Sequence, residues 1–195
     1  MLGTTRVTAQ ETMRYASDED FCGIFVKDMD GLYRLSFLLT GEHSLAEECF
    51  VRGLEDSQKG TPVFKEWTHS WARRSIIRRA IQIIRPQTAD NSRSQPPSAI
   101  GTSYAMTLPA KIAKIIDLPQ FERFVFVISV LERYSSQECS LLLSCARGDV
   151  TAAQIWALRQ IASAHERPAK LVSIDSDEQG LPHNHRIIPQ RTQQA

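Results

Sequence analysis

YSSQECSLLLSCARGDVTAAQIWALRQI, residues 134–161, is the stretch around which the rest of this chain is expected to fold. Its spacing predicts a first helix over residues 136–143, because Leu142 and Leu143 follow Cys139 by three and four positions. Side chains at these steps share one face of a helix, so this short helix is expected to pack on one side.

A turn and a second helix are predicted to follow. The run SCARG breaks the apolar pattern, and Gly148 is expected to turn the chain because glycine adopts positive φ at little cost. The second helix is expected to begin near Asp149 and to carry one apolar stripe. That stripe consists of Val150, Ala153, Ala157 and Ile161. Two helices this close suit a helix-turn-helix, whose second helix can enter the DNA major groove, and equally an αα-hairpin without a DNA role.

Composition narrows the classes of protein to which the chain can belong. Its 195 residues fit one or two small domains, and its 42% hydrophobic content supports real cores. Lys and Arg number 23 against 22 Asp and Glu, so a nucleic-acid role has to rest on local basic patches. The four cysteines lack zinc-finger spacing, and we expect no metal and no cofactor. Without a signal-peptide pattern or an apolar run of about 18 residues, we expect a cytoplasmic protein with no membrane insertion.

A long helix is predicted from about Asp18 to Thr40, with Gly41 as its C-cap. Its apolar residues recur at helical steps and define one face that should be buried. The stripe consists of Phe21, Phe25, Leu32, Leu35 and Leu39, widened by Ile24, Val26, Tyr33 and Leu38. Residues 1–17 are polar and are expected to be loose.

Two further helices are predicted over residues 44–57 and 62–84. Ser44 and Glu47 have the spacing of a capping box for the second helix. The third helix is expected to begin at Pro62, because the missing amide hydrogen of proline costs nothing at the first helical position. Gly60-Thr61-Pro62 separates the two helices.

The third helix is the most informative by charge. Its cationic residues outnumber the acidic ones six to one, counting Lys65, Arg73, Arg74, Arg78, Arg79 and Arg85 against Glu66. A basic face interleaved with indoles suits a strand of nucleic acid, because arginine meets phosphates and aromatic rings stack on bases. The alternative is an ordinary solvated helix. Trp67 and Trp71, one turn apart, are expected to lie at least partly in the core.

The predicted fold is all-α, with two small helical domains joined by a flexible linker. The first domain, a three-helix bundle, spans residues 18–85, and the Ser-, Thr- and Pro-rich linker spans residues 86–107. The helix-turn-helix domain spans residues 108–167, and residues 168–195 form a tail that we expect to be disordered. Within the second domain we expect a short helix near residues 109–116 and a longer one from residue 118 to 133. The longer helix should bury Phe121, Phe124, Val125, Ile128 and Leu131. A flexible link leaves the relative placement of the two domains to a partner.

Three blocks resemble the extracytoplasmic-function (ECF) group of bacterial RNA polymerase sigma factors in order and spacing. LYRLSFLLTGEHSLAEECF, residues 32–50, is similar to the first promoter-domain block, in which a helix ends at Thr-Gly before an acidic helix. FKEWTHSWARR, residues 64–74, is similar to the F-x-x-W-x-x-x-x-A-R motif. LPQFERFVFVISVLERYSSQECSLLL, residues 118–143, resembles the L-P-x-x-x-R start of the second DNA-binding domain. The resemblance covers residues 20–165, most of the chain.

This resemblance implies a sigma factor that directs RNA polymerase core to promoter DNA for transcription initiation and performs no chemistry itself. Residues implied on the polymerase-facing helix are Glu47, Glu48, Phe50 and Leu54. Residues implied to contact DNA are Lys65, Trp67, Arg73, Arg74, Arg78 and Arg79 on the third helix, and Arg147, Thr151, Ala152, Gln154 and Arg159 on the recognition helix.

Several positions depart from the family pattern. Val51 and Arg52 stand where the polymerase-facing helix usually continues with Gln-Glu, and Thr151 and Ala153 stand where the recognition helix usually offers a Lys and an Arg. Each lost cation removes roughly one counterion released on DNA binding. The usual capping Ser is Ala146 here, so the cap is expected to shift to Asp149. These departures favour an alternative: a sigma-like interaction module that binds an anti-sigma factor or another regulator without reading promoters.

Overall fold

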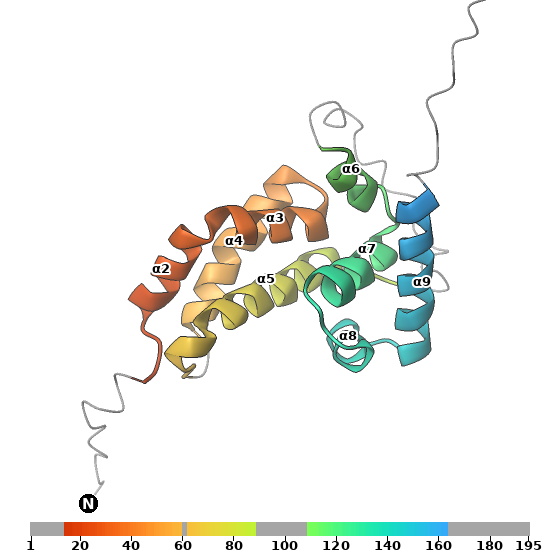
Figure 1. The fold of residues 1–195 in the computed structure, drawn as a ribbon. Coiled ribbons are helices and arrows are strands. Elements are labelled where there is room, and N and C mark those ends of the chain that lie inside the picture. Colours follow the sequence, from red (N-terminus) through yellow and green to blue (C-terminus); the bar gives the residue numbers. More distant parts are fainter. Residues whose placement is uncertain (1–13, 60–61, 89–108, 164–195) are drawn as a thin grey trace, which may run out of the picture.

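The structure, a computed structural model, describes residues 14–59, 62–88 and 109–163, and over these residues it is all-α, as the sequence predicts (Figure 1). The first group of helices is α2 (Asp18–Lys27), α3 (Met29–Thr40), α4 (His43–Gln58), the short 3₁₀ turn η1 (Lys65–Trp67) and α5 (Thr68–Ile84). The second group is α6 (Ala110–Ile116), α7 (Gln120–Phe126), its π-helical continuation η4 (Val127–Leu131), α8 (Ser136–Leu143) and α9 (Arg147–Ser163). Most of the predicted linker and the whole predicted tail lie outside the described residues.

The single long helix predicted from Asp18 is wrong, because the chain bends at Asp28 into α2 and α3. Asp28 has φ −112° and ψ 33°, outside helical values, although its amide still donates to the Ile24 carbonyl at 2.9 Å. A Cβ on Gly31 would lie 2.2 Å from the Asp28 carboxylate, so glycine makes room for this bend. The central residues of the predicted stripe are nevertheless buried, whereas Ile24 and Tyr33 are half-buried and Val26 is 76% exposed. Gly41 ends α3 at φ 77°, as expected.

α4 and α5 do not begin as predicted, because residues near their starts make other contacts. α4 begins at His43, and the Ser44 hydroxyl donates to the Glu42 carboxylate at 2.6 Å, so the predicted capping box is absent. α5 begins at Thr68, well after Pro62. Phe64 is extended because it pairs with Tyr15 in an isolated antiparallel bridge and stacks on its ring at 4.9 Å.

The longer helix of the second group, predicted over residues 118–133, covers residues 120–131 as α7 and η4 together. Phe121, Phe124, Val125 and Ile128 are buried as predicted, whereas Leu131 is 42% exposed. The wider π-helical winding of η4 shifts side chains away from the regular α-helical spacing, which moves Leu131 off the buried face.

The helix-turn-helix pair is present as α8 and α9, but its turn is not where the sequence placed it. Ser144 ends α8 at φ 52°, while Gly148 lies inside α9. The predicted shift of the cap to Asp149 is wrong, because α9 already begins at Arg147 and Asp149 lies in its first turn. From there the Asp149 carboxylate accepts a hydrogen bond from the Ala146 amide at 3.2 Å. The predicted stripe of α9 faces inward: Val150, Ala153 and Ala157 are buried, and Ile161 packs against the core.

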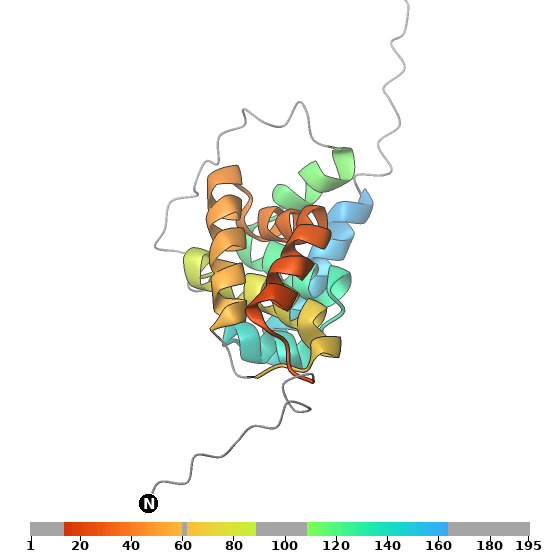
Figure 2. The same ribbon diagram turned by 90° about the vertical axis from the view of Figure 1, so that its left-hand side faces the viewer.

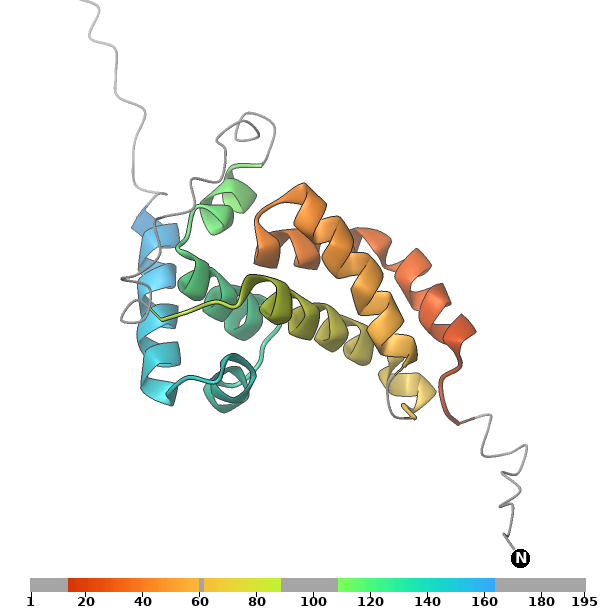
Figure 3. The ribbon, with the colours of Figure 1, turned by 180° about the vertical axis from the view of Figure 1, so that it is seen from behind.

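The two groups pack against each other, and residues of both contribute to one hydrophobic core. The helices within each group pack along their lengths, whereas the groups meet mainly where α3 contacts α6, α7 and η4. α2 and α9 lie at opposite ends of the molecule in Figure 1 and Figure 3. Figure 2 shows the first group in front of the second. The structure thus fixes a relative placement that the sequence was expected to leave to a partner.

A buried arginine joins the two groups. Arg123, 2% exposed, donates to the carbonyls of Leu39 and Thr40 at the end of α3, both at 3.3 Å, and to the Ile116 carbonyl at 3.0 Å. Burial lowers the pKa of Arg123 to about 10, because no carboxylate offsets its desolvation. A Cβ on Gly41 would lie 3.0 Å from the Arg123 guanidinium. The glycine that ends α3 therefore also admits the arginine.

Candidate nucleic-acid interface

The cationic segment formed by η1 and α5 carries the largest set of predicted DNA contacts, and acidic side chains pair with three of its five predicted cations. Lys65 forms an ion pair with Asp20 at 3.1 Å. Arg79 forms a fork with the Asp56 carboxylate, with Nε 2.9 Å from Oδ2 and Nη2 2.6 Å from Oδ1. Because Asp20 lies on α2 and Asp56 on α4, both pairs stay within the first group. The net charge counted along α5 therefore overstates the charge that this helix presents.

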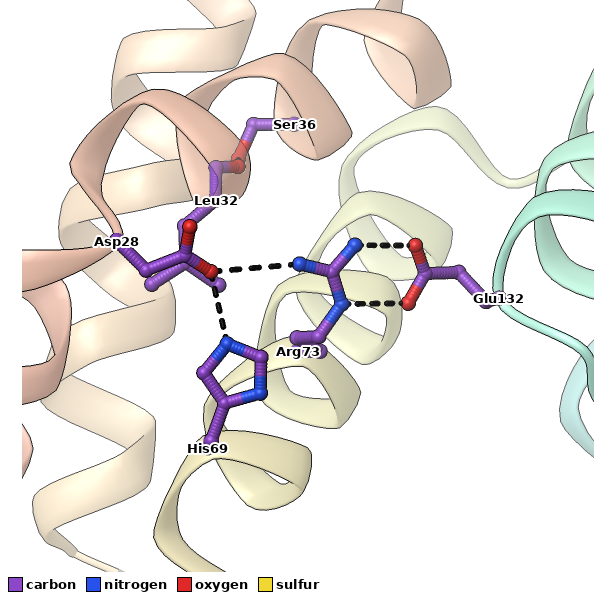
Figure 4. A network of polar contacts seen from close by, with 6 residues as sticks. All are labelled: Asp28, Leu32, Ser36, His69, Arg73 and Glu132. Atoms are coloured by element: carbon purple, nitrogen blue, oxygen red, sulfur yellow. Dashed lines mark hydrogen bonds and ion pairs between the residues drawn. The ribbon is translucent and has the colours of Figure 1, made fainter.

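Arg73 is the centre of a network that links the two groups (Figure 4). Its Nε donates to Glu132 Oε2 at 2.7 Å and its Nη2 donates to Glu132 Oε1, which makes a bidentate pair. Its Nη1 lies 3.5 Å from Asp28 Oδ2, and the same oxygen lies 2.9 Å from His69 Nε2. The hydrogen bonds from Glu132 raise the pKa of Arg73, and burial opposes this shift. All three guanidinium nitrogens are thus engaged.

Arg74 and Arg78 differ from their neighbours, because neither is held by a carboxylate fork. Arg74 is half-buried beside the second group. Burial raises the pKa of the Tyr134 hydroxyl, and the Arg74 charge partly opposes this. The Ser135 amide and hydroxyl lower the pKa of Glu138, and Arg74 adds a smaller effect in the same direction. Arg78 is exposed, so it presents its charge to solvent in this arrangement.

The aromatic residues of this region point outward more than predicted. Trp67 is 57% exposed, although it was expected to lie partly in the core. Its ring meets Phe64 edge-on at 5.3 Å, and Phe64 in turn stacks on Tyr15. Trp71 is half-buried, as expected, and its Nε1 is buried without a hydrogen-bond partner. Trp67 thus offers a flat apolar ring near the start of α5.

The predicted polymerase-facing residues of α4 divide into two kinds. Glu47 and Glu48 are exposed, and Glu48 pairs with Arg52 at 3.0 Å. Phe50 and Leu54 are half-buried and pack against the core, with Phe50 edge-on to the Phe25 ring at 5.2 Å. The exposed surface of α4 therefore includes Glu47 and Glu48 together with Val51 and Arg52.

The predicted recognition residues lie on the outer side of α9, as a helix-turn-helix requires. Arg147, Thr151, Ala152 and Arg159 are exposed, and Gln154 is half-buried. The Thr151 hydroxyl donates to a carbonyl one turn earlier in α9, so in this arrangement its oxygen can accept from a partner but cannot donate to one. The same side exposes three large apolar residues that sequence reasoning missed: Ile155, Trp156 and Leu158, at 47%, 40% and 44%. Their positions off the buried stripe could have identified them.

The acidic partners of α5 were also missed, and no pattern in the sequence could have found them. Asp20 lies in α2 and Asp56 in α4, whereas Asp28 lies at the bend between α2 and α3 and Glu132 directly follows η4. Their pairing with these cations depends on how the helices pack.

Comparison with known proteins leaves the family open. No model of a known protein family matches this chain, and no curated protein matches it in sequence. Among the described residues, none of the helices has the length and apolar character needed to cross a membrane.

Proposed function

We propose that this chain is a sigma-type initiation factor, which joins RNA polymerase core and directs it to promoter DNA without catalysing a reaction. The supporting observation is the pair α8 and α9. α9 buries its Val150 stripe and leaves the opposite side open, where Arg147 and Arg159 can reach a DNA backbone. A helix held this way fits the major groove.

α5 supports this proposal in part. The exposed Arg78 on α5 and the exposed Trp67 on the preceding η1 match a surface that holds an unpaired strand by phosphate contact and stacking. Arg73 and Arg79 are in internal ion pairs, which weakens α5 as a binder in this arrangement. We therefore propose that the structure describes a closed form of the factor, in which the two groups of helices pack together and occupy Arg73. We also propose that the factor acts in the cytoplasm.

The decisive experiment mixes the full chain with RNA polymerase core and follows association by size-exclusion chromatography and run-off transcription. We expect co-elution at micromolar concentration and transcripts that depend on the added chain. Arg78→Ala should reduce transcription, whereas Arg34→Ala removes an exposed cation from α3 and should not. Absence of association with core enzyme would overturn the proposal.

A second candidate is a sigma-like interaction module that binds an anti-sigma factor or another regulator in place of DNA. The exposed apolar residues Ile155 and Leu158 favour it, because a surface that contacts phosphates is normally more cationic. Replacing both residues by lysine separates the candidates. A DNA reader would gain affinity for duplex DNA from two added cations, whereas binding of a regulator to this apolar surface would be lost.

A further inference from the structure

Glu132 occupies the edge of Arg73 that suits a phosphate group. A guanidinium presents Nε and one Nη as a fork that matches either a carboxylate or a phosphate. In this structure both donors of that edge bind Glu132, and the remaining Nη1 faces Asp28. Arg73 therefore has no free fork for an external anion.

The two carboxylates that bind Arg73 come from different groups of helices. Separation of the two groups would therefore remove one carboxylate from Arg73 and leave the other in place. Asp28 lies between α2 and α3, so it remains beside Arg73 whatever the second group does. Glu132 directly follows η4 in the second group, and its side chain is only 8% exposed. Moving the second group away would remove Glu132 and free the fork, while Arg73 would stay oriented by Asp28.

The neighbouring arginine is covered by the same segment. Arg74 lies beside Tyr134 and Glu138, which follow Glu132 in the connection to α8 and in its first turn. Residues 132–138 thus place two carboxylates and a hydroxyl along two consecutive arginines of α5. A strand of nucleic acid would present phosphate oxygens to the same pair.

We propose that residues 132–138 act as an internal mimic of a nucleic-acid strand, so that closure of the two groups and strand binding on Arg73 and Arg74 exclude each other. This inference rests on the proposed role of α5 and specifies how it is regulated. Occupancy of the arginine pair by Glu132 lowers strand affinity, and any partner that pulls the second group away raises it. The two states are linked, so strand binding also favours the open form.

Glu132→Gln in the full chain tests this proposal, since it keeps the side-chain size and removes the charge. The matched control, Glu19→Gln, removes the same charge from an exposed position on α2. Binding of a fluorescein-labelled oligodeoxythymidine is measured by anisotropy, and the radius of gyration by small-angle X-ray scattering. We expect Glu132→Gln to bind at least about fivefold more tightly than the control, the lower end of usual coupling between sites. Its radius of gyration should also increase.

Exchanging the charges of Arg73 and Glu132 supplies a second test. Arg73→Glu alone should open the molecule, and Arg73→Glu combined with Glu132→Arg should restore the wild-type radius of gyration while oligonucleotide binding stays weak. Circular dichroism confirms that each variant is folded. Equal affinities and equal radii for Glu132→Gln and Glu19→Gln would overturn the proposal. If Glu132→Gln opens and binds the oligonucleotide more tightly but no variant associates with polymerase core, the initiation role fails and the internal mimic stands.

Discussion

Adding one methyl group at Gly53 is expected to destabilise the first group of helices. Gly53 is buried in α4 and faces α5, where a Cβ would lie 2.6 Å from Ile76 Cδ1 and 3.3 Å from Cγ1. Carbon atoms in contact normally lie about 3.5–4.0 Å apart. Ile76 is fully buried, so its terminal methyl cannot move into solvent to relieve the overlap. Either the side chain leaves its rotamer or α4 and α5 move apart.

Two opposing effects set the magnitude for Gly53→Ala. Alanine is favoured over glycine in a helix by about 1 kcal/mol, whereas overpacking a core costs about 1–3 kcal/mol. An overlap of roughly 1 Å places the cost at the upper end of that range, and we expect a net loss of about 1–2 kcal/mol. Gly23→Ala is the matched control, because nothing lies within 4 Å of the added Cβ on α2. That variant should gain about 0.5–1 kcal/mol.

Urea unfolding followed by far-UV circular dichroism measures both changes. We expect the midpoint to fall for Gly53→Ala and to rise for Gly23→Ala, with unchanged slopes. A Gly53→Ala protein as stable as wild type would show that α4 and α5 do not approach as closely as the structure has them. A loss in both variants would instead point to a general intolerance of substitution in α2 and α4.

Three further predictions concern the groups that hold the fold together. Arg123→Lys keeps the charge, but the lysine side chain cannot reach all three carbonyls at once, so the free energy of unfolding measured in urea should fall by about 1–3 kcal/mol. Wild-type stability of this variant would contradict the role assigned to the Arg123 hydrogen bonds. Ser135→Ala removes the capping box of α8 and should cost about 1 kcal/mol, whereas Gln137→Ala at an exposed position of the same helix should not. Burial raises the pKa of Cys49 to about 12 and of Cys139 to about 11. The two protonated thiols therefore make their full contribution to the free energy of unfolding below pH 9, and this contribution is lost as pH rises towards 11–12. Urea unfolding across that range should show a decline that is smaller in Cys49→Ala, and an identical decline in that variant would exclude the Cys49 thiol as a cause.

Much of the helix pattern could be predicted, because it depends on local spacing. The stripe of α9 and the range of α8 follow from apolar residues three and four positions apart, and both are confirmed. Turn positions were harder, since Ser144 rather than Gly148 takes the positive φ. A serine adopts this conformation when packing and its neighbours require it, and nothing local in the sequence signals that.

The bend at Asp28 shows why tertiary contacts limit such predictions. The apolar stripe resumes beyond it at Leu32, seven residues after Phe25, so periodicity indicates one helix. Asp28 is also the residue that contacts His69 and Arg73 of α5, which lie 41 and 45 residues further along the chain. The candidate site was limited in the same way: the sequence identifies the cations of α5, but only the packed structure reveals which carboxylates neutralise them.

The pairing of these cations changes the charge that α5 can offer a strand. Lys65 and Arg79 pair with acids of their own group, so these pairs persist whether the molecule is closed or open. Arg78 is exposed in the closed form, and opening adds Arg73 and Arg74. Each phosphate neutralised on a single strand contributes about 0.7 to the slope of log affinity against log salt. The slope should therefore steepen from about 0.7 to about 2 on opening, because about three cations become available. A slope near 3.5, which five unpaired charges would give, requires that the ion pairs within the first group also break.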